Sequence, residues 1–336
     1  MTRIGIIGLG FMGRTHYEAY QKIPGAQVVM VADKDPKRAA GDLTGGWGNF
    51  DAGNITQLPM DRIRGTTDFH ELMNDNQVDV VDICVPTPGH VELALAALSS
   101  GKHVLCEKPL ATSVADAMKI ANAAKTAKGF FMPAMCVRFW PQWEWLKRAV
   151  ADQTYGPVHA ATFRRLGTMP GGWFKDGKLS GGALFDLHVH DVDFLYHLFG
   201  KPKGVFSRGY SKTSGEIDHI VTQYLFDGPA LVVAEGGWCQ ADGWPFAMRY
   251  TVNFERATAD YDSSRADEPL LLYEGGKKQT IEAAKSDGFV GELSYFLECV
   301  AAGKRPQRVT AEDAVMGLTI IEGEKRSVGS GRVEEV

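Results

Sequence analysis

Apolar runs and amphipathic stretches alternate along the first 134 residues of the chain. Short, almost continuous apolar runs predict buried strands at residues 3–7, 26–32, 78–85, 103–106 and 129–133. Amphipathic stretches predict helices at residues 12–22, 36–43, 69–75, 90–99 and 114–128. This alternation is typical of a doubly wound parallel sheet. Residues 45–64 lack such periodicity and are rich in Gly and Asn, so we expect an inserted surface loop there.

The pattern changes near residue 135. Closely spaced apolar runs predict strands at residues 158–165, 204–211, 219–226, 230–237, 246–253 and 270–273. Helices are expected at residues 182–198, 290–302 and 311–327. Strands that follow one another with few helices between them favour a mostly antiparallel sheet. We therefore expect an α/β domain over residues 1–134 and an α+β domain over residues 135–336.

Composition narrows the class of protein. The 36 Lys and Arg and 41 Asp and Glu give a net charge of −5, which provides no attraction for nucleic acid. No apolar run approaches the length of a membrane span, and the N-terminus lacks the pattern of a signal peptide, so a cytoplasmic location is expected. Disulfides and a cysteine zinc site are not expected, since the cysteines are odd in number, scattered and without C-x-x-C: Cys84, Cys106, Cys136, Cys239 and Cys299.

A glycine motif follows the first predicted strand. Gly8, Gly10 and Gly13 form G-x-G-x-x-G, with Phe11 and Met12 inside it. In this pattern the first glycine permits a tight turn, the second lets a pyrophosphate approach the backbone, and the third lets helix and strand pack closely. The helix N-terminus then favours the anion. We interpret residues 1–134 as a Rossmann domain.

Asp33 ends the second predicted strand, 20 residues after Gly13. A carboxylate there accepts hydrogen bonds from the adenosine ribose and repels a 2′-phosphate, which favours NAD over NADP. Lys34, Lys37 and Arg38 lie nearby and would tolerate a phosphate. The alternative, a glycine turn that binds nothing, is disfavoured because strand, glycines, helix and acid occur together.

Two further segments carry candidate chemistry. Glu107 and Lys108 follow a predicted strand, at the edge where open α/β sheets bind ligands, although a surface ion pair explains them equally well. Ser180 is a candidate N-cap for the helix at 182–198, in which Asp186 and His190 stand at i and i+4. A carboxylate beside an imidazole suits a general base.

His188 would point roughly 160° away from His190 on an ideal helix and is expected to be packed or exposed. A metal site built from Asp186, His188, His190, Asp191 and Asp193 is the weaker alternative, because helical geometry separates the two histidines. We expect no metal.

These motifs occur in a characteristic order. The glycine motif is followed by Thr87-Pro88-Gly89-His90, then by Glu107-Lys108-Pro109, and then by Gly181-Gly182-Ala183-Leu184-Phe185-Asp186-x-x-x-His190. With Tyr155-Gly156-Pro157-Val158, this set resembles the glucose-fructose oxidoreductase / inositol dehydrogenase family, often written Gfo/Idh/MocA, over nearly the whole chain.

The resemblance implies a fold and residue roles. It implies an open-faced sheet in a C-terminal substrate-binding domain that often forms the interface of a homodimer or homotetramer. It implies catalytic roles for Lys108, Asp186 and His190, and a Lys108–Pro109 peptide bond that is often cis. Thr87, Pro88, His90 and Glu107 would line the cofactor. Arg138, Arg164 and Trp173 stand where substrate contacts tend to lie. Glycine is common in the family at the position of His188.

The residues and the resemblance together predict an NAD-dependent oxidoreductase acting on a secondary alcohol of a sugar, inositol or related polyol. In this scheme His190 removes the hydroxyl proton, Asp186 orients the imidazole, and Lys108 stabilises the alkoxide. Two alternatives remain open. The protein would retain NAD and recycle it in a redox-assisted glycosidase or sugar–sugar oxidoreductase, or it would be a non-catalytic NAD-binding regulator.

Overall fold

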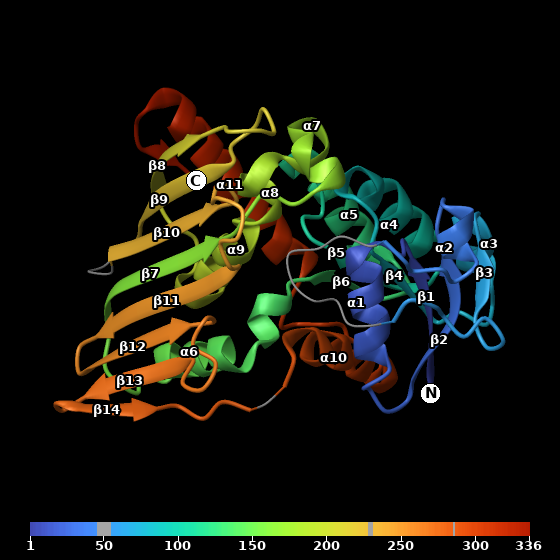
Figure 1. Cartoon of the computed structure of the whole chain (residues 1–336), viewed down its shortest axis with the longest axis horizontal. Helices are drawn as coiled ribbons and strands as arrows, with labels where there is room; N and C mark the ends of the chain where they lie inside the picture. Colours follow the sequence, from blue (N-terminus) through green and yellow to red (C-terminus); the bar gives the residue numbers. More distant parts are fainter. Residues whose placement is uncertain (46–54, 228–230, 285) are drawn as a thin grey trace. The chain divides into compact units, whose positions relative to one another are not determined.

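The computed structural model describes residues 1–45, 55–227, 231–284 and 286–336 in two compact units (Figure 1). Unit 1 consists of Met1–Cys136 and Asp287–Val315, and unit 2 of Val137–Ser286 and Met316–Val336. The first boundary lies within two residues of the expected one. Residues 287–315, which we expected in the C-terminal domain, belong instead to unit 1.

Unit 1 is built on a six-stranded parallel sheet. Its strands run in the order β3-β2-β1-β4-β5-β6, which is the order of a Rossmann fold. The strands are β1 (Thr2–Ile7), β2 (Ala26–Ala32), β3 (Arg64–Thr66), β4 (Val80–Ile83), β5 (His103–Glu107) and β6 (Phe131–Ala134). Each of the four residues of β4 is buried, as expected for a strand covered on both faces.

The helices of unit 1 begin close to the expected positions. They are α1 (Phe11–Tyr20), α2 (Pro36–Ala39), α3 (Phe69–Asn74), the short 3₁₀ helix η1 (Thr87–Gly89), α4 (His90–Ser99), α5 (Val114–Thr126) and α10 (Gly288–Ala302). Helices α1 and α10 lie side by side (Figure 1). The aromatic ring of Phe289 on α10 lies 6.3 Å from the ring of His16 on α1. This contact explains why a segment distant in sequence belongs to the first unit.

The surface loop expected at residues 45–64 lies partly outside the described residues, which omit 46–54. Its described part is packed rather than exposed at Leu58 and Ile63. It ends in β3, an edge strand that the apolar pattern did not predict, because three residues are too few to show alternation.

Unit 2 is built on a nine-stranded sheet in the order β14-β13-β12-β11-β7-β10-β9-β8-β15. Strands β7 and β10 pair in parallel, and the remaining neighbours pair antiparallel. The fold class expected from the sequence is thus confirmed in both units. The strands are β7 (Val158–Leu166), β8 (Gly204–Tyr210), β9 (His219–Leu225), β10 (Leu231–Gly237), β11 (Ala247–Phe254), β12 (Ala257–Asp262), β13 (Leu270–Glu274), β14 (Lys277–Thr280) and β15 (Glu334–Glu335).

Helices cover one face of the unit 2 sheet. Trp143 is fully buried on that face, with edge-to-face contacts to Phe194 at 4.7 Å and to Tyr250 at 5.2 Å between ring centroids. The helical segments of the unit are η2 (Cys136–Phe139), α6 (Pro141–Ala151), η3 (Gly172–Lys175), α7 (Gly177–Ser180), α8 (Gly182–Asp186), α9 (Val189–Phe199) and α11 (Ala311–Ser330), of which η2 and α11 begin in unit 1.

The prediction of a single helix over residues 182–198 is wrong. The chain forms α8 and α9, separated by a turn at Leu187 and His188. The His188 N–H donates to the carbonyl of Ala183, five residues back, so the helix is locally widened. The buried His188 ring lies against Gly236 of β10, where a Cβ atom would come within 2.5 Å of its Nδ1. Packing of this ring into the sheet interrupts the regular helix.

The described residues contain no helix that is both long and apolar enough to cross a membrane.

Candidate functional site

The glycine motif forms a tight turn between β1 and α1. Gly8 has a φ of +91°, which favours glycine. A Cβ on Gly13 would lie 1.9 Å from the carbonyl oxygen of Gly8, so α1 approaches the strand as closely as only glycine permits. At Gly10 a Cβ would meet no other atom within 4 Å, which leaves that stretch of backbone open to a ligand. Phe11 and Met12 begin the helix.

Asp33 lies directly beside this turn. Its Oδ2 accepts the Leu9 N–H at 2.7 Å, and its Oδ1 accepts the Asp35 N–H at 2.9 Å. The carboxylate is buried, and Arg38 Nη1 lies 3.7 Å from Oδ2. An open glycine backbone, a helix N-terminus and a carboxylate held at the end of β2 together fit a dinucleotide, with the pyrophosphate at the turn and the ribose at Asp33.

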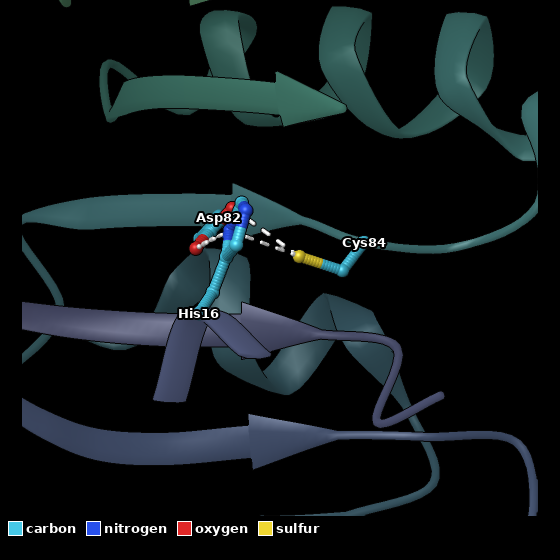
Figure 2. Close-up of side chains that lie close together, drawn as sticks. All are labelled: His16, Asp82 and Cys84. Atoms are coloured by element: carbon cyan, nitrogen blue, oxygen red, sulfur yellow. Dashed lines mark hydrogen bonds and ion pairs between the residues drawn. The ribbon is translucent and has the colours of Figure 1, made fainter. Parts of the chain in front are cut away.

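A buried polar cluster lies next to the same turn, on α1 and the ends of β4 and β5. Figure 2 shows His16 reaching from α1 toward Asp82 on β4, with Cys84 just after that strand. His16 Nδ1 lies 2.9 Å from Asp82 Oδ2 and 3.4 Å from Cys84 Sγ. The Tyr20 hydroxyl donates to the same Asp82 oxygen at 3.0 Å. On the other side of the ring, His16 Nε2 lies 3.1 Å from Glu107 Oε1.

These contacts favour a charged imidazole. Burial by itself lowers the pKa of His16, but the charge of Asp82 and its hydrogen bond outweigh burial and raise that pKa well above the ordinary value. Burial likewise opposes the charge of Glu107, yet the hydrogen bond and charge of His16 leave the pKa of Glu107 lowered. The ring is therefore an imidazolium held between two carboxylates.

His16, Asp82 and Cys84 also place a ligand atom each within 4.8 Å of one another, as a metal site requires. A metal would need the thiolate of Cys84. Burial, the largest influence, raises the pKa of this thiol and keeps it protonated. The hydrogen-bonded network accounts for the cluster without an ion.

The backbone around Lys108 is held from two directions. The Lys108 N–H donates to Oε2 of Glu107 at 3.0 Å. The Lys108–Pro109 peptide bond is cis, as the sequence led us to expect. The carbonyl oxygen of Pro109 lies 2.8 Å from Nδ1 of the buried His90, whose Nε2 lies 2.8 Å from the carbonyl oxygen of Val85. Burial lowers the pKa of His90 despite these contacts.

The residues predicted to line the cofactor all belong to unit 1. Thr87 and Pro88 belong to η1, which begins four residues after the end of β4, and Thr87 is buried. His90 and Glu107 are also buried, and their side chains contact backbone and His16 as described above. The structure thus gives Glu107 and His90 a part in holding the backbone.

Asp186 and His190 lie on either side of the turn in unit 2. Asp186 is the last residue of α8 and is buried, whereas His190 is the second residue of α9 and half-buried. The ideal i, i+4 geometry assumed from the sequence does not continue through this turn. His188 is fully buried, and its Nε2 lies 3.1 Å from the Tyr224 hydroxyl and 3.3 Å from Glu324 Oε1.

The acids that invited a metal have other partners. Asp191 accepts two hydrogen bonds from Arg165, at 2.9 and 3.1 Å. Asp193 accepts two from Arg138, at 2.8 and 2.6 Å. Both pairs are almost completely buried, and both fasten α9 to neighbouring segments of unit 2. Arg138, a predicted substrate contact, is committed to this ion pair.

The two other predicted substrate contacts are Arg164 on β7 and Trp173 on η3. Arg164 donates to Glu235 at 2.6 Å, and its side chain is 42% exposed. Its neighbour Arg165 contacts α9, so alternation along β7 places Arg164 on the opposite face of the sheet. Trp173 on η3 stacks on Phe174 at 4.2 Å, and Phe174 packs against the core cluster of Ala183, Leu187 and Trp238.

Sequence reasoning missed the buried cluster around His16. A signal was present, since Asp82 interrupts the apolar run Val80-Val81-Asp82-Ile83 and a lone acid in a buried strand needs a partner. The partner could not be found, because His16 is 66 residues away in the chain.

Comparison with known families agrees with the geometry. A model described as "Oxidoreductase family, NAD-binding Rossmann fold" matches residues 2–135. A second, described as "GFO/IDH/MocA C-terminal domain", matches residues 143–260. The chain belongs to the Gfo/Idh/MocA oxidoreductase family. Members of this family bind a nicotinamide dinucleotide in the Rossmann domain, which agrees with the turn and acid described above.

Similar proteins in this family include dehydrogenases of cyclic polyols. Myo-inositol 2-dehydrogenase of Thermotoga maritima is 28% identical over 354 residues, with 99% of each chain covered. The scyllo-inositol 2-dehydrogenase (NAD(+)) of Bacillus subtilis is 24% identical, covering 95% of this chain and 91% of the relative. A solved "probable dehydrogenase" from Thermotoga maritima superposes with a TM-score of 0.81 at 26% identity, covering 99% of this chain and 98% of that one.

Because Arg138 and Asp193 form a buried ion pair, removal of one partner should destabilise the protein. Arg138→Met leaves the Asp193 carboxylate buried without its guanidinium, which we expect to cost about 3–5 kcal/mol. Adding Asp193→Leu should recover much of this loss, because no isolated charge then remains. Urea unfolding followed by circular dichroism measures both variants. A mild loss in Arg138→Met, with no recovery in the double variant, would contradict a structural role for the pair.

Proposed function

We propose that this protein is an NAD-dependent dehydrogenase that oxidises a secondary alcohol of a sugar, inositol or related polyol. One observation carries the proposal. Within unit 1, a dinucleotide turn and the Lys108 segment are joined through a single side chain, because His16 on α1 contacts Glu107 at the end of β5. A lysine is thereby held at the carboxyl edge of the sheet, where open α/β folds bind their ligands.

The chemistry assigned to the residues follows the family pattern. NAD, when bound, supplies the hydride acceptor. The imidazole of His190 takes the hydroxyl proton, and the carboxylate of Asp186 orients the ring and stabilises its positive charge. The ammonium of Lys108 stabilises the developing alkoxide. Loss of one such group typically slows turnover by about 10²-fold or more.

The substrate class rests on the relatives. Two of them are named as dehydrogenases of myo-inositol and scyllo-inositol and are matched over at least nine-tenths of their length. A cyclic polyol presents several secondary hydroxyls, each of which suits the same combination of base and ammonium. The half-buried stack of Trp173 on Phe174 offers an apolar surface of the kind that packs against the C–H face of a sugar ring.

Substitution of Lys108 tests the reaction. Lys108→Ala should lower kcat about 10²-fold or more with the active polyol, because the alkoxide loses its counter-charge, while the Kd for NAD changes by less than about threefold. Nicotinamide absorbance on mixing the protein with NAD and a panel of inositols, monosaccharides and sugar acids provides the assay, and His190→Gln is expected to behave in the same way. Exposed Lys119→Ala on α5 serves as a matched control.

Near wild-type turnover in both the Lys108 and His190 variants would refute these roles. NAD binding without net reduction by any panel member would refute the dehydrogenase and favour a recycled cofactor or a regulator.

We propose NAD rather than NADP as the cofactor. The two oxygens of Asp33 are fixed by the N–H groups of Leu9 and Asp35, so the carboxylate cannot turn away from a 2′-phosphate without losing both hydrogen bonds. Arg38 is close enough to offset part of this repulsion, at 3.7 Å. The NAD(+) in the name of the Bacillus subtilis relative supports the same preference.

Fluorescence titration should show NADH binding at least about tenfold more tightly than NADPH. Asp33→Asn should narrow the ratio of the two affinities by weakening the binding of NADH and strengthening that of NADPH. Arg38→Ala should widen the ratio. Tighter binding of NADPH to the unaltered protein would overturn the assignment.

We also propose that the protein is a homodimer or homotetramer, joined through the open face of the unit 2 sheet. Large apolar side chains remain exposed there: Phe206 at 36%, Val221 at 41%, Leu231 at 53% and Tyr210 at 54%. Cross-strand register places Phe206, Tyr210 and Val221 on one face of β8 and β9. Exposed apolar side chains gathered on one face of a sheet, with polar residues such as Arg208 and Gln223 among them, are typical of an interface between subunits.

Val221→Arg places a charge in the middle of this surface and should shift the protein to a monomer. Light scattering coupled to size exclusion gives the mass directly. Met118→Arg, at an exposed position on α5 of unit 1, is the control and should leave the mass unchanged. A monomeric unaltered protein, or an oligomer unaffected by Val221→Arg, would show that this face is not the interface.

A further inference from the structure

We propose that His16 is a positioning residue for Lys108, and that it acts through its contact with Glu107. The inference rests on the function proposed above in assigning a catalytic role to Lys108. His16 lies on α1, the helix that follows the glycine turn, and in this proposal it helps to fix the position of the Lys108 backbone.

Two contacts connect His16 with the backbone of Lys108. His16 Nε2 lies 3.1 Å from Oε1 of Glu107. The second oxygen of the same carboxylate, Oε2, accepts the N–H of Lys108 at 3.0 Å. The imidazole therefore fixes one end of a planar group whose other end fixes the lysine peptide. His16 is fully buried and Glu107 is 5% exposed, so water does not substitute for either contact.

The opposite side of the ring has a different task. Through Nδ1, His16 contacts Asp82 and Cys84 (Figure 2). Tyr20 donates to the same oxygen of Asp82. These contacts join α1 to β4 and do not reach Lys108. The two nitrogens thus separate a structural contact on one side from a positioning contact on the other.

Charge strengthens the positioning contact. The imidazolium compensates the buried charge of Glu107, which would otherwise be costly next to the apolar ends of β4 and β5. A compensated carboxylate keeps both of its oxygens in place. The Pro109 carbonyl is held separately by His90, and the Lys108 N–H is held by Glu107.

Two amide substitutions separate the two sides of the ring. The amide of Gln at position 16 reaches the place of Nε2 and can donate a hydrogen bond to Glu107. The amide of Asn reaches the place of Nδ1 and can donate only to Asp82. Both variants lose the cation and one contact, so both should be destabilised to a similar degree. Only His16→Asn releases Glu107.

We expect kcat for the active polyol to fall at least about tenfold further in His16→Asn than in His16→Gln. The Kd for NAD should stay within about threefold of the wild-type value in both variants. In the Lys108→Ala background the two variants should have equal kcat, because the residue they act through is absent. Tyr20→Phe removes a hydrogen bond from the Asp82 side and should leave kcat within about twofold of wild type. Equal kcat for His16→Asn and His16→Gln with Lys108 present would overturn the proposal.

A second measurement needs neither substrate nor turnover. Hydrogen exchange of peptides covering residues 104–112 should be faster in His16→Asn than in His16→Gln, since the Lys108 N–H loses a fixed acceptor. Equal exchange in the two variants overturns the positioning role even if the protein proves to be no dehydrogenase. If the His16→Asn variant does not fold, the Glu107→Gln variant is compared with wild type. Unchanged hydrogen exchange of the peptides covering residues 104–112 in that variant also overturns the positioning role.

Discussion

The buried imidazole of His16, which contacts Asp82 on one side and Glu107 on the other, is the interaction that connects α1 with β4 and β5 in unit 1. It joins the helix after the glycine turn to the strand before Lys108, which are separate in sequence and meet at one edge of the sheet. Burying three ionisable groups is costly, and the network is stable because each charge has an opposite charge within hydrogen-bond distance.

Unit 2 uses buried ion pairs in a comparable way. Arg165 and Arg138 each bind an acid of α9, and His188 pairs with Glu324 of α11. Removal of either partner of an Arg–Asp pair would leave a charge in an apolar core, so these two pairs fix α9 against η2 and β7. The helix that carries His190 is therefore placed by charges on its buried side.

Much of the fold was predictable because it follows from local pattern. Strands β1, β2, β4, β5 and β6 of unit 1 appeared as apolar runs. The glycine motif with Asp33 predicted the dinucleotide turn, because tight turns and close approaches demand glycine wherever they occur. The widened turn at His188 was not predictable. It results from packing of the ring against Gly236, 48 positions later in the chain.

The sequence by itself determined the Rossmann domain and the family, since both follow from short motifs with fixed spacing, and the family resemblance supplied the candidate catalytic residues. Only the tertiary structure decided which polar residues are committed to the core. Arg138, Glu107 and His16 all carry groups suited to binding or catalysis, and nothing in their local sequence shows their partners. The reason is physical: a buried charge is stabilised by an opposite charge near it in space, and the fold alone brings such charges together.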